Sequence, residues 1–278
     1  MAEHPVNNDR YAVVGNPVAH SLSPQIHDSF AEQMQQQMSY EAIELAIDDF
    51  PVEILELQRQ GLKGLNVTVP FKQQAWKICS HRSPLAEQAG AVNTLSFMDN
   101  GDICGDNTDG TGLTRDLQDN HQVFIQNRKI LILGAGGAVR GVLAPLLALE
   151  PESILIANRT LNKAEKLAAE FSAIGTISTC AYDDLGAEKF DLVINATAAG
   201  LSNQVPPVNE EVIGNSTICY DLMYQLEGPT AFVAWARNQC AAGAIDGLGM
   251  LVEQAAESFY IWRGVRVNTT EVINNLRR

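Results

Sequence analysis

The sequence predicts an α/β fold made of two domains. Its 278 residues are enough for two ordinary domains with an ample core. Short stretches that are apolar or that alternate between apolar and polar residues, such as residues 11–15 and 40–47, predict strands. They are separated by segments whose apolar residues recur at helical spacing. A fully apolar strand at residues 129–133 runs into a glycine-rich turn and a helix, which is typical of a nucleotide-binding domain with a parallel sheet.

Composition and charge exclude several classes of partner. The chain is 46% apolar and 19% charged, and its net charge of −14 speaks against a nucleic-acid partner, which would need a basic face. The same charge repels a small anion, so an anionic ligand would need local donors. The longest apolar runs are too short to span a membrane, and residues 1–5 show no export signal. We therefore expect a cytoplasmic protein without a membrane contact.

The cysteines and histidines do not form a metal or disulfide pattern. Five scattered cysteines without a C-x-x-C pair argue against a disulfide framework and a structural zinc site. His20 and His27 are seven residues apart, a poor spacing for two ligands on one helix face. We expect a reduced compartment and no metal.

Two serines lie in the loop after the first expected strand. Ser23 precedes Pro24 and a segment of helical periodicity, so Ser23 is a good N-cap and Pro24 a good first helical residue. Capping does not explain Ser21. Two hydroxyls beside a helix N-terminus suit a carboxylate, although a cap plus a solvated serine is the simpler explanation from this loop alone.

A second polar group lies at the end of an expected strand. Residues 65–69 alternate between apolar and polar side chains and include β-branched residues, which predicts this strand. Pro70 ends that strand because it has no N–H to donate. Asn66, Thr68 and Lys72 therefore gather where a strand breaks into a helix. Taken alone, they are equally compatible with a solvated strand end.

Three further residues each have an ordinary structural explanation. Asp109 lies in a polar, glycine-rich segment, residues 105–112, and either it or Thr108 would cap the helix that begins there. Tyr224 would be a buried aromatic residue. Gln254 lies in the early turns of the long apolar helix that opens at Gly247, where a glutamine is usually solvated.

The strand at residues 129–133 leads into the sequence Gly134-Ala135-Gly136-Gly137-Ala138 and a helix. Glycines at such a turn let the backbone approach a pyrophosphate, which the helix N-terminus then stabilises. Position 139 is valine, so the chain departs from the general G-x-G-x-x-G pattern and has a tighter G-x-G-G-A form.

The end of the next strand, residues 153–157, indicates which dinucleotide is bound. A cofactor with a free ribose 2′-hydroxyl is usually held by Asp or Glu there, whereas this chain has Asn158, Arg159 and Thr160, with Lys163 one turn later. A carboxylate would repel a 2′-phosphate and Arg159 would bind it in a two-pronged way. The pattern predicts NADP(H) rather than NAD.

Taken together, the motifs resemble the shikimate dehydrogenase family over essentially the whole chain. Each motif is weak alone, but eight in the right order at the right distances are highly specific. They are Ser21-Leu22-Ser23, Asn66-Val67-Thr68-Val69-Pro70-Phe71-Lys72, Ala91-Val92-Asn93-Thr94, Asn107-Thr108-Asp109-Gly110, Gly134-Ala135-Gly136-Gly137-Ala138, Asn158-Arg159-Thr160, Asp221-Leu222-Met223-Tyr224 and Gly247-Leu248-Gly249-Met250-Leu251-Val252-Glu253-Gln254.

The resemblance implies an enzyme that reversibly reduces 3-dehydroshikimate to shikimate with NADPH, the fourth step toward chorismate and the aromatic amino acids. Lys72 and Asp109 would be the catalytic pair, because hydride delivered to a ketone carbon leaves an alkoxide that needs a proton from a positioned acid. Which of the two moves the proton stays open. Ser21 and Ser23 would bind the substrate carboxylate, with Tyr224 close by. The ring hydroxyls would be held by Asn66, Thr68, Asn93, Asp109 and Gln254.

The same resemblance implies an architecture of two α/β domains separated by a cleft. The substrate-binding domain would be residues 1–108 plus 248–278, and the Rossmann-like NADP-binding domain would be residues 109–247. Gly247 would lie close to the nicotinamide and Leu222 on the cofactor side. The sequence leaves the oligomeric state open, with a homodimer as one assembly compatible with it.

Two alternative functions remain at this point. One is a quinate/shikimate dehydrogenase that uses NAD(P), against which Asn158-Arg159-Thr160 argues because that class tends to carry an acidic residue there. The other is a non-catalytic nucleotide-sensing protein on the same scaffold, which would have no reason to retain both Lys72 and Asp109.

Overall fold

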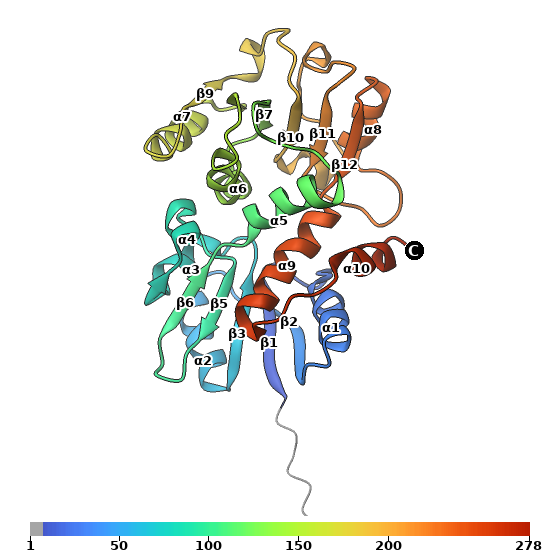
Figure 1. Cartoon of the computed structure of the whole chain (residues 1–278). Helices are drawn as coiled ribbons and strands as arrows, with labels where there is room; N and C mark the ends of the chain where they lie inside the picture. The colour runs from blue at the N-terminus through green and yellow to red at the C-terminus, as the bar shows by residue number, and fades with distance from the viewer. Residues whose placement is uncertain (1–7) are drawn as a thin grey trace, which may run out of the picture. The chain divides into compact units, whose positions relative to one another are not determined.

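A computed structural model describes residues 8–278 and divides this part of the chain into two compact units (Figure 1). The first unit runs to Asp109 and includes Val252–Leu276 and Arg278, and the second comprises Gly110–Leu251 and Arg277. Residues 1–5, in which the sequence shows no export signal, lie outside the described residues. Compactness assigns no function to either unit, so the division into a substrate and a cofactor domain stays a prediction.

The first unit is built on a mixed six-stranded sheet in the order β2-β1-β3-β5-β6-β4. β1 pairs in parallel with β2 and β3, whereas β5 is antiparallel to β3 and β6. The strands are β1 (Asp9–Gly15), β2 (Met38–Glu44), β3 (Leu62–Val67), β4 (His81–Arg82), β5 (Thr94–Phe97) and β6 (Ile103–Asp106).

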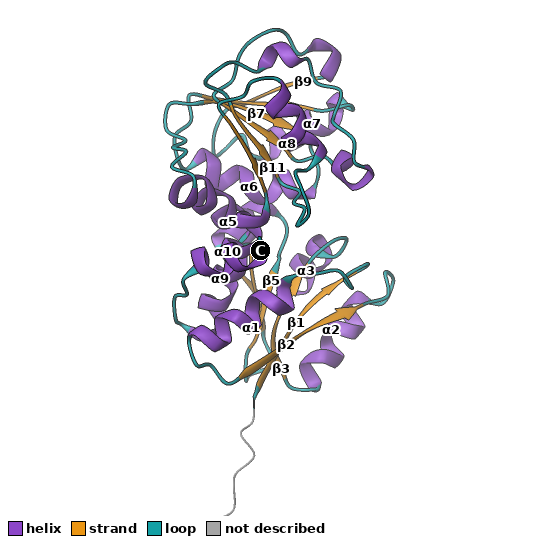
Figure 2. Ribbon diagram, turned by 90° about the vertical axis from the view of Figure 1, so that its right-hand side faces the viewer, coloured by secondary structure: helices purple, strands orange, loops and turns teal. Residues whose placement is uncertain are grey.

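Helices cover both faces of this sheet (Figure 2). Ala12 and Val14 of β1 share a core with Phe50, Ile54, Phe71 and Ala75, whereas Tyr11 and Val13 face the other way and pack with Val18, Tyr40 and Trp262. This alternation follows from the period of two along a strand. The helices are α1 (Ser23–Gln33), α2 (Phe50–Arg59), α3 (Lys72–Ile78), α4 (Pro84–Ala89) and α10 (Thr269–Leu276), with the greater part of α9 (Leu248–Arg263).

The second unit contains an all-parallel six-stranded sheet in the order β12-β11-β10-β7-β8-β9. The chain extends this sheet in one direction from β7 to β8 and β9, and then in the other direction from β10 to β12. The loops after β7 and β10 therefore meet where the strand order reverses, which is where such sheets bind ligands. The strands are β7 (Lys129–Leu133), β8 (Ser153–Ala157), β9 (Ile177–Cys180), β10 (Leu192–Asn195), β11 (Ile218–Asp221) and β12 (Gly243–Asp246).

Residues of β7 alternate between two cores. Ile130 and Ile132 pack with residues of α6 and α7, whereas Leu131 and Leu133 pack with Phe232 of α8 and its neighbours. A strand covered on both faces must be apolar throughout, which is why its sequence reads as an uninterrupted hydrophobic run. The helical segments are α5 (Asp109–Arg115), η1 (Asp116–Asn120), α6 (Gly137–Leu147), α7 (Leu161–Glu170), η2 (Tyr182–Asp184), η3 (Ala198–Ser202), η4 (Glu210–Val212) and α8 (Ala231–Asn238).

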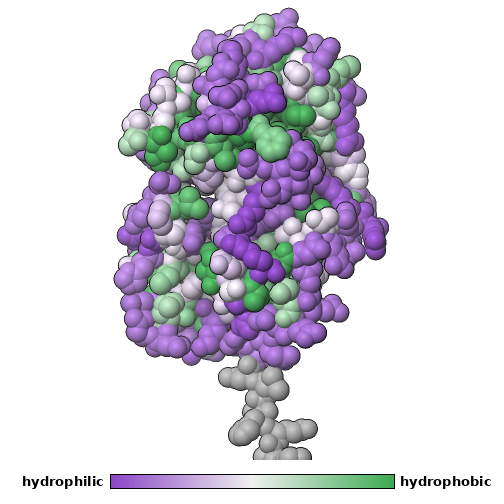
Figure 3. Space-filling model, viewed as in Figure 1, coloured by the Kyte–Doolittle hydropathy of each residue, from purple (hydrophilic) through white to green (hydrophobic). Residues whose placement is uncertain are grey.

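The surface seen in Figure 3 is mostly hydrophilic, and apolar residues form only small patches on each unit. Among residues 8–278, no helix has the length and apolar character needed to cross a membrane.

Candidate active site

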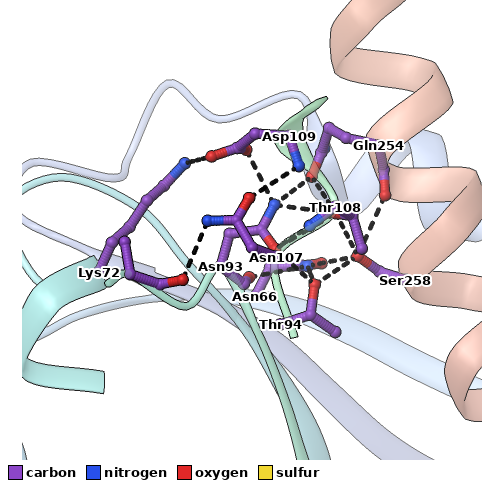
Figure 4. A network of polar contacts seen from close by, with 10 residues as sticks. Asn66, Lys72, Asn93, Thr94, Asn107, Thr108, Asp109, Gln254 and Ser258 are labelled. Carbon is purple, nitrogen blue, oxygen red and sulfur yellow. Dashed lines mark hydrogen bonds and ion pairs between the residues drawn. The ribbon is translucent and has the colours of Figure 1, made fainter. Parts of the chain in front are cut away.

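A lysine and an aspartate form a close ion pair in the first unit (Figure 4). The Nζ of Lys72, the first residue of α3, lies 2.6 Å from Oδ2 of Asp109, the first residue of α5. The Lys72 side chain is 25% exposed and that of Asp109 is 9% exposed, so the pair is largely shielded from solvent. Charge-assisted hydrogen bonds of this length are strong and fix both groups.

Asn93 holds the other oxygen of this aspartate. Its Nδ2 donates to Asp109 Oδ1 at 2.9 Å and also approaches Gln254 Oε1 at 3.2 Å. Its Oδ1 accepts the backbone N–H of Thr108 at 2.9 Å. Because that N–H can only donate, the orientation of the Asn93 amide is determined. The predicted residues are thus linked in one series of contacts, from Lys72 to Asp109, Asn93 and Gln254.

Asn66 and Thr68 lie at the end of β3, next to this group. The Asn66 amide is buried; its Oδ1 accepts from Tyr40 at 2.7 Å and its Nδ2 donates to the backbone oxygen of Asn93 at 3.2 Å. The expected strand at residues 65–69 ends two residues early, at Val67, because Phe71 N–H closes a turn onto the Thr68 carbonyl at 3.0 Å. The Thr68 hydroxyl has no hydrogen-bond partner within the described chain.

The expectation that Ser23 caps the first helix is wrong. The N-cap of α1 is Leu22 and no side chain caps the helix, because the structure places Ser23 one position inside it. Ser21 Oγ instead accepts the Ser23 N–H at 3.2 Å and lies 3.1 Å from Ser23 Oγ. The two hydroxyls therefore lie side by side, and neither is needed as a conventional cap.

Sequence reasoning missed three hydroxyl residues that complete this network, namely Thr94, Thr108 and Ser258. Each is buried, and Ser258 Oγ lies 2.7 Å from Thr94 Oγ1 and 3.3 Å from Thr108 Oγ1. Thr94 and Thr108 stand beside predicted residues in the motifs quoted above. Ser258 has no such signal, because only the fold brings α9 to β5.

A separate pocket of about 480 Å³ lies in the second unit at the carboxyl ends of β7, β8 and β10. Seven of the predicted cofactor residues line it, together with residues that follow β9 and β10, such as Tyr182 and Thr197. The seven are Gly134, Ala135, Gly136, Asn158, Arg159, Thr160 and Lys163.

The glycine turn leaves room for a large anion. Gly134 has a φ of +106°, and a Cβ there would lie 3.1 Å from the Ala196 carbonyl oxygen, so only glycine fits. A Cβ on Gly136 or Gly137 would meet nothing within 4 Å. Gly136 is the N-cap of α6 and has no side chain that could cap the helix. The N–H groups of the first turn, which form the positive end of the helix dipole, therefore face this open space. Gly137 and Ala138 begin α6 and do not line the pocket.

The rim of this pocket is basic. Arg159 and Lys163 are exposed, and neither forms an ion pair with any residue that the structure describes. Asn158 turns its amide onto the Thr160 carbonyl at 2.8 Å and so shapes the loop that carries Arg159. The donor set therefore fits a dinucleotide with an additional phosphate on its ribose.

Leu222, Gly247 and Tyr224 also belong to the second unit but do not line the pocket. Leu222 and Gly247 are neighbours: a Cβ on Gly247 would lie 2.5 Å from the Leu222 carbonyl oxygen, and Gly247 N–H donates to Met223 O at 3.0 Å. Tyr224 is half-buried, and this burial raises its pKa. Its predicted place beside the substrate carboxylate stays a prediction.

Among residues 8–278, no three His, Cys, Asp or Glu side chains come together as a metal site would require. The first site offers a lysine–carboxylate ion pair among neutral amides and hydroxyls. The chemistry of the second is the binding of phosphates by backbone N–H groups and two cations.

Three family models match successive parts of the chain. The shikimate dehydrogenase substrate binding domain matches residues 13–95, shikimate/quinate 5-dehydrogenase matches residues 117–208, and the shikimate 5′-dehydrogenase C-terminal domain matches residues 247–277.

Individual relatives agree over nearly the full length. A shikimate dehydrogenase (NADP(+)) of Alkalilimnicola ehrlichii is 52% identical over 269 residues, covering 97% of this chain and 98% of the relative. The crystal structure of an Ael1 enzyme from Pseudomonas putida is 44% identical with a TM-score of 0.90, covering 98% and 99% of the two chains.

A shikimate 5-dehydrogenase from Thermus thermophilus, solved in complex with NADP(H) and shikimate, is 32% identical with a TM-score of 0.86, covering 97% of this chain and 99% of that one. A relative that is 52% identical covers 97% of this chain, and the three family models match it in sequence order. This chain belongs to the shikimate dehydrogenase family.

Proposed function

We propose that this protein catalyses the reversible, NADPH-dependent reduction of 3-dehydroshikimate to shikimate. The observation that carries the proposal is the Lys72–Asp109 pair, 2.6 Å apart, among neutral donors and acceptors. As the ketone is reduced, its oxygen becomes negatively charged, and the pair would give a proton to that oxygen to complete the alcohol. In the reverse direction the pair accepts the proton of the alcohol.

The neutral polar groups around the pair support a polyol substrate. The Thr68 hydroxyl, the second lone pair of Asn66 Oδ1 and the remaining lone pairs of the Asp109 carboxylate can each bond a ring hydroxyl. Asn93 and Gln254 are proposed to hold the ring hydroxyls beside them. A site built this way rejects analogues that lack a hydroxyl, because its buried polar groups would then be left unpaired. Ser21 and Ser23 present adjacent hydroxyls for the carboxylate. Tyr224 is kept as a predicted further donor.

The second unit supports NADP(H) as the coenzyme. The open glycine turn takes the pyrophosphate at the α6 N-terminus, and Arg159 and Lys163 supply the positive charge for the 2′-phosphate. When bound, the coenzyme supplies the hydride, whereas residues of this chain bind, orient and transfer the proton. Leu222 and Gly247 lie on the nicotinamide side in this proposal.

Steady-state kinetics with shikimate and quinate, each with NADP and with NAD, test the proposal against its alternatives. We expect the highest kcat/KM for shikimate with NADP. A clear preference for quinate or NAD would favour the quinate/shikimate dehydrogenases. The absence of turnover with all four pairs, together with tight NADP binding, would favour a nucleotide sensor.

A further inference from the structure

Buried hydroxyl and amide groups form a continuous chain behind Asp109 (Figure 4). It runs from Tyr40 through Asn66, Ser258, Thr94 and Asn93 to the carboxylate. Each of the five residues that lead to the carboxylate is at most 7% exposed. Groups this deeply buried keep the partners that the fold gives them, since water does not replace a lost bond.

Two backbone groups fix the direction of donation at both amides. The Asn93 Oδ1 faces the Thr108 N–H, which can only donate, so Asn93 Nδ2 must face Asp109. The Asn66 Nδ2 faces the backbone oxygen of Asn93 at 3.2 Å, which can only accept, so Asn66 Oδ1 must accept from Tyr40. Neither amide can be reversed without facing two like groups against each other.

The hydroxyls between these amides then have one consistent arrangement. Thr94 Oγ1 lies 2.9 Å from Asn93 Oδ1, a carbonyl oxygen, so Thr94 must donate to it. With its only hydrogen used, Thr94 accepts from Ser258 at 2.7 Å. Ser258 Oγ in turn accepts from Asn66 Nδ2 at 2.9 Å. The Gln254 backbone oxygen, 3.1 Å from Ser258 Oγ, and Thr108 Oγ1, 3.3 Å from it, compete for the same hydrogen at longer distances.

We propose that Thr94 and Ser258 are positioning residues of the catalytic pair. Together with the Thr108 N–H, which sets the direction of the Asn93 amide, they hold Asn93 in place so that it donates to Asp109 Oδ1, and this leaves Asp109 Oδ2 for Lys72. Neither hydroxyl touches the reacting atoms, and both act through Asn93. The proposal rests on the proposed function of Lys72 and Asp109, and it adds a reason why α9 must carry a hydroxyl at position 258.

The test is Thr94→Val, which keeps the shape of the side chain and removes its hydroxyl. We expect kcat for shikimate oxidation to fall about 5- to 10-fold, the effect of one net hydrogen bond, whereas KM for shikimate and NADP changes less than about 2-fold. Thr94→Ser should restore kcat because it restores the donor. Ser258→Ala should reproduce the loss, and the double variant should lose little more than either single one, because both act through one chain.

Thr217→Val is the matched control. Thr217 is fully buried in the second unit and donates to the Phe190 carbonyl at 2.6 Å, so this variant loses a buried hydroxyl of the same kind away from the pair. It should lower thermal stability without lowering kcat. If Thr94→Val does not fold, Ser258→Ala alone answers the question.

The outcomes separate the two proposals. If wild-type protein shows no turnover of shikimate with NADP, the proposed function itself is wrong. The wild type can instead be active while Thr94→Val and Ser258→Ala keep full kcat, change only KM, or lower kcat by amounts that add in the double variant. Any of these results would show that the two hydroxyls support the fold or the ligand and do not position the pair.

Discussion

His27 is a buried histidine that should make this protein sensitive to acid. Its ring is 0% exposed and stacks on Tyr40 with centroids 4.1 Å apart, and neither ring nitrogen has a hydrogen-bond partner among the described residues. The nearby Asn66 amide does not serve as one, because its atoms are engaged by Tyr40, Asn93, Thr94 and Ser258. Burial lowers the pKa of His27 from 6.5 to about 3.

The sign of the effect follows from which state binds the proton. Below pH 6.5 the unfolded chain protonates His27, whereas the folded protein keeps the ring neutral until about pH 3, so stability is lost as the pH falls through this window. Each pKa unit corresponds to about 1.36 kcal/mol, so the loss from His27 is about 2 kcal/mol at pH 5 and close to zero at pH 7.5.

His27→Phe isolates this contribution because it keeps an aromatic ring and removes both nitrogens. Urea unfolding followed by tryptophan fluorescence is the assay, since the Trp262 ring lies 5.5 Å from that of His27 and reports on the same core. The free energy of unfolding of the variant, minus that of the wild type, should grow by about 2 kcal/mol between pH 7.5 and pH 5. Other titrating groups are common to both proteins and cancel in the difference.

His20→Gln is the control, because His20 is exposed and its replacement should leave the pH dependence unchanged. A difference between His27→Phe and wild type that stays constant from pH 7.5 to pH 5 would show that the folded protein protonates His27 as easily as the unfolded chain. The account of a neutral, buried ring would then be wrong.

Three further variants test the two sites. Lys72→Ala should lower kcat by about 10²–10⁴-fold with little change in KM, the scale of a lost acid–base group; a change in KM alone would make Lys72 a binding residue. Arg159→Ala should raise KM for NADPH and leave NADH kinetics nearly unchanged, and equal losses with both coenzymes would mean that Arg159 is structural. Gly247→Ala should lower the melting temperature and the activity, because its Cβ would lie 2.5 Å from the Leu222 carbonyl oxygen. Unchanged activity and melting temperature would contradict the close packing of these two loops.

The sequence predicted best those elements whose residue pattern matches their burial in the fold. The strands Lys129–Leu133 and Ser153–Ala157 have the expected bounds. The apolar runs and periodicity of these segments match their burial, so local pattern and global fold agree. At the helix around Ser23 the local rule failed, because Ser21 bonds the Ser23 backbone and the helix begins one residue earlier than the capping pattern indicates.

The candidate site was predictable residue by residue but not as a network. Lys72, Asn93 and Asp109 were expected from motifs, and the structure places them in direct contact. Ser258 was not expected, because its partner Thr94 is 164 positions away and no periodicity links α9 to β5. A serine on an apolar helix gives no local signal, so only the folded chain identifies its partner.

The distribution of charge explains how an acidic protein can hold an anionic coenzyme. With 19 basic against 33 acidic residues, many cations of the second unit are committed: Lys129 contacts Glu188 at 2.7 Å, Arg128 contacts Asp191 at 3.3 Å, and Arg140 pairs with Glu170. Arg159 and Lys163 form no such pair with any described residue and stand on the rim of one pocket. A phosphate that binds there displaces no existing carboxylate, so its attraction to Arg159 is not offset by breaking an ion pair. Because both groups are exposed, salt should screen this attraction, and KM for NADPH should rise with ionic strength more steeply than KM for NADH. Equal salt dependence for the two coenzymes would place the 2′-phosphate away from these cations.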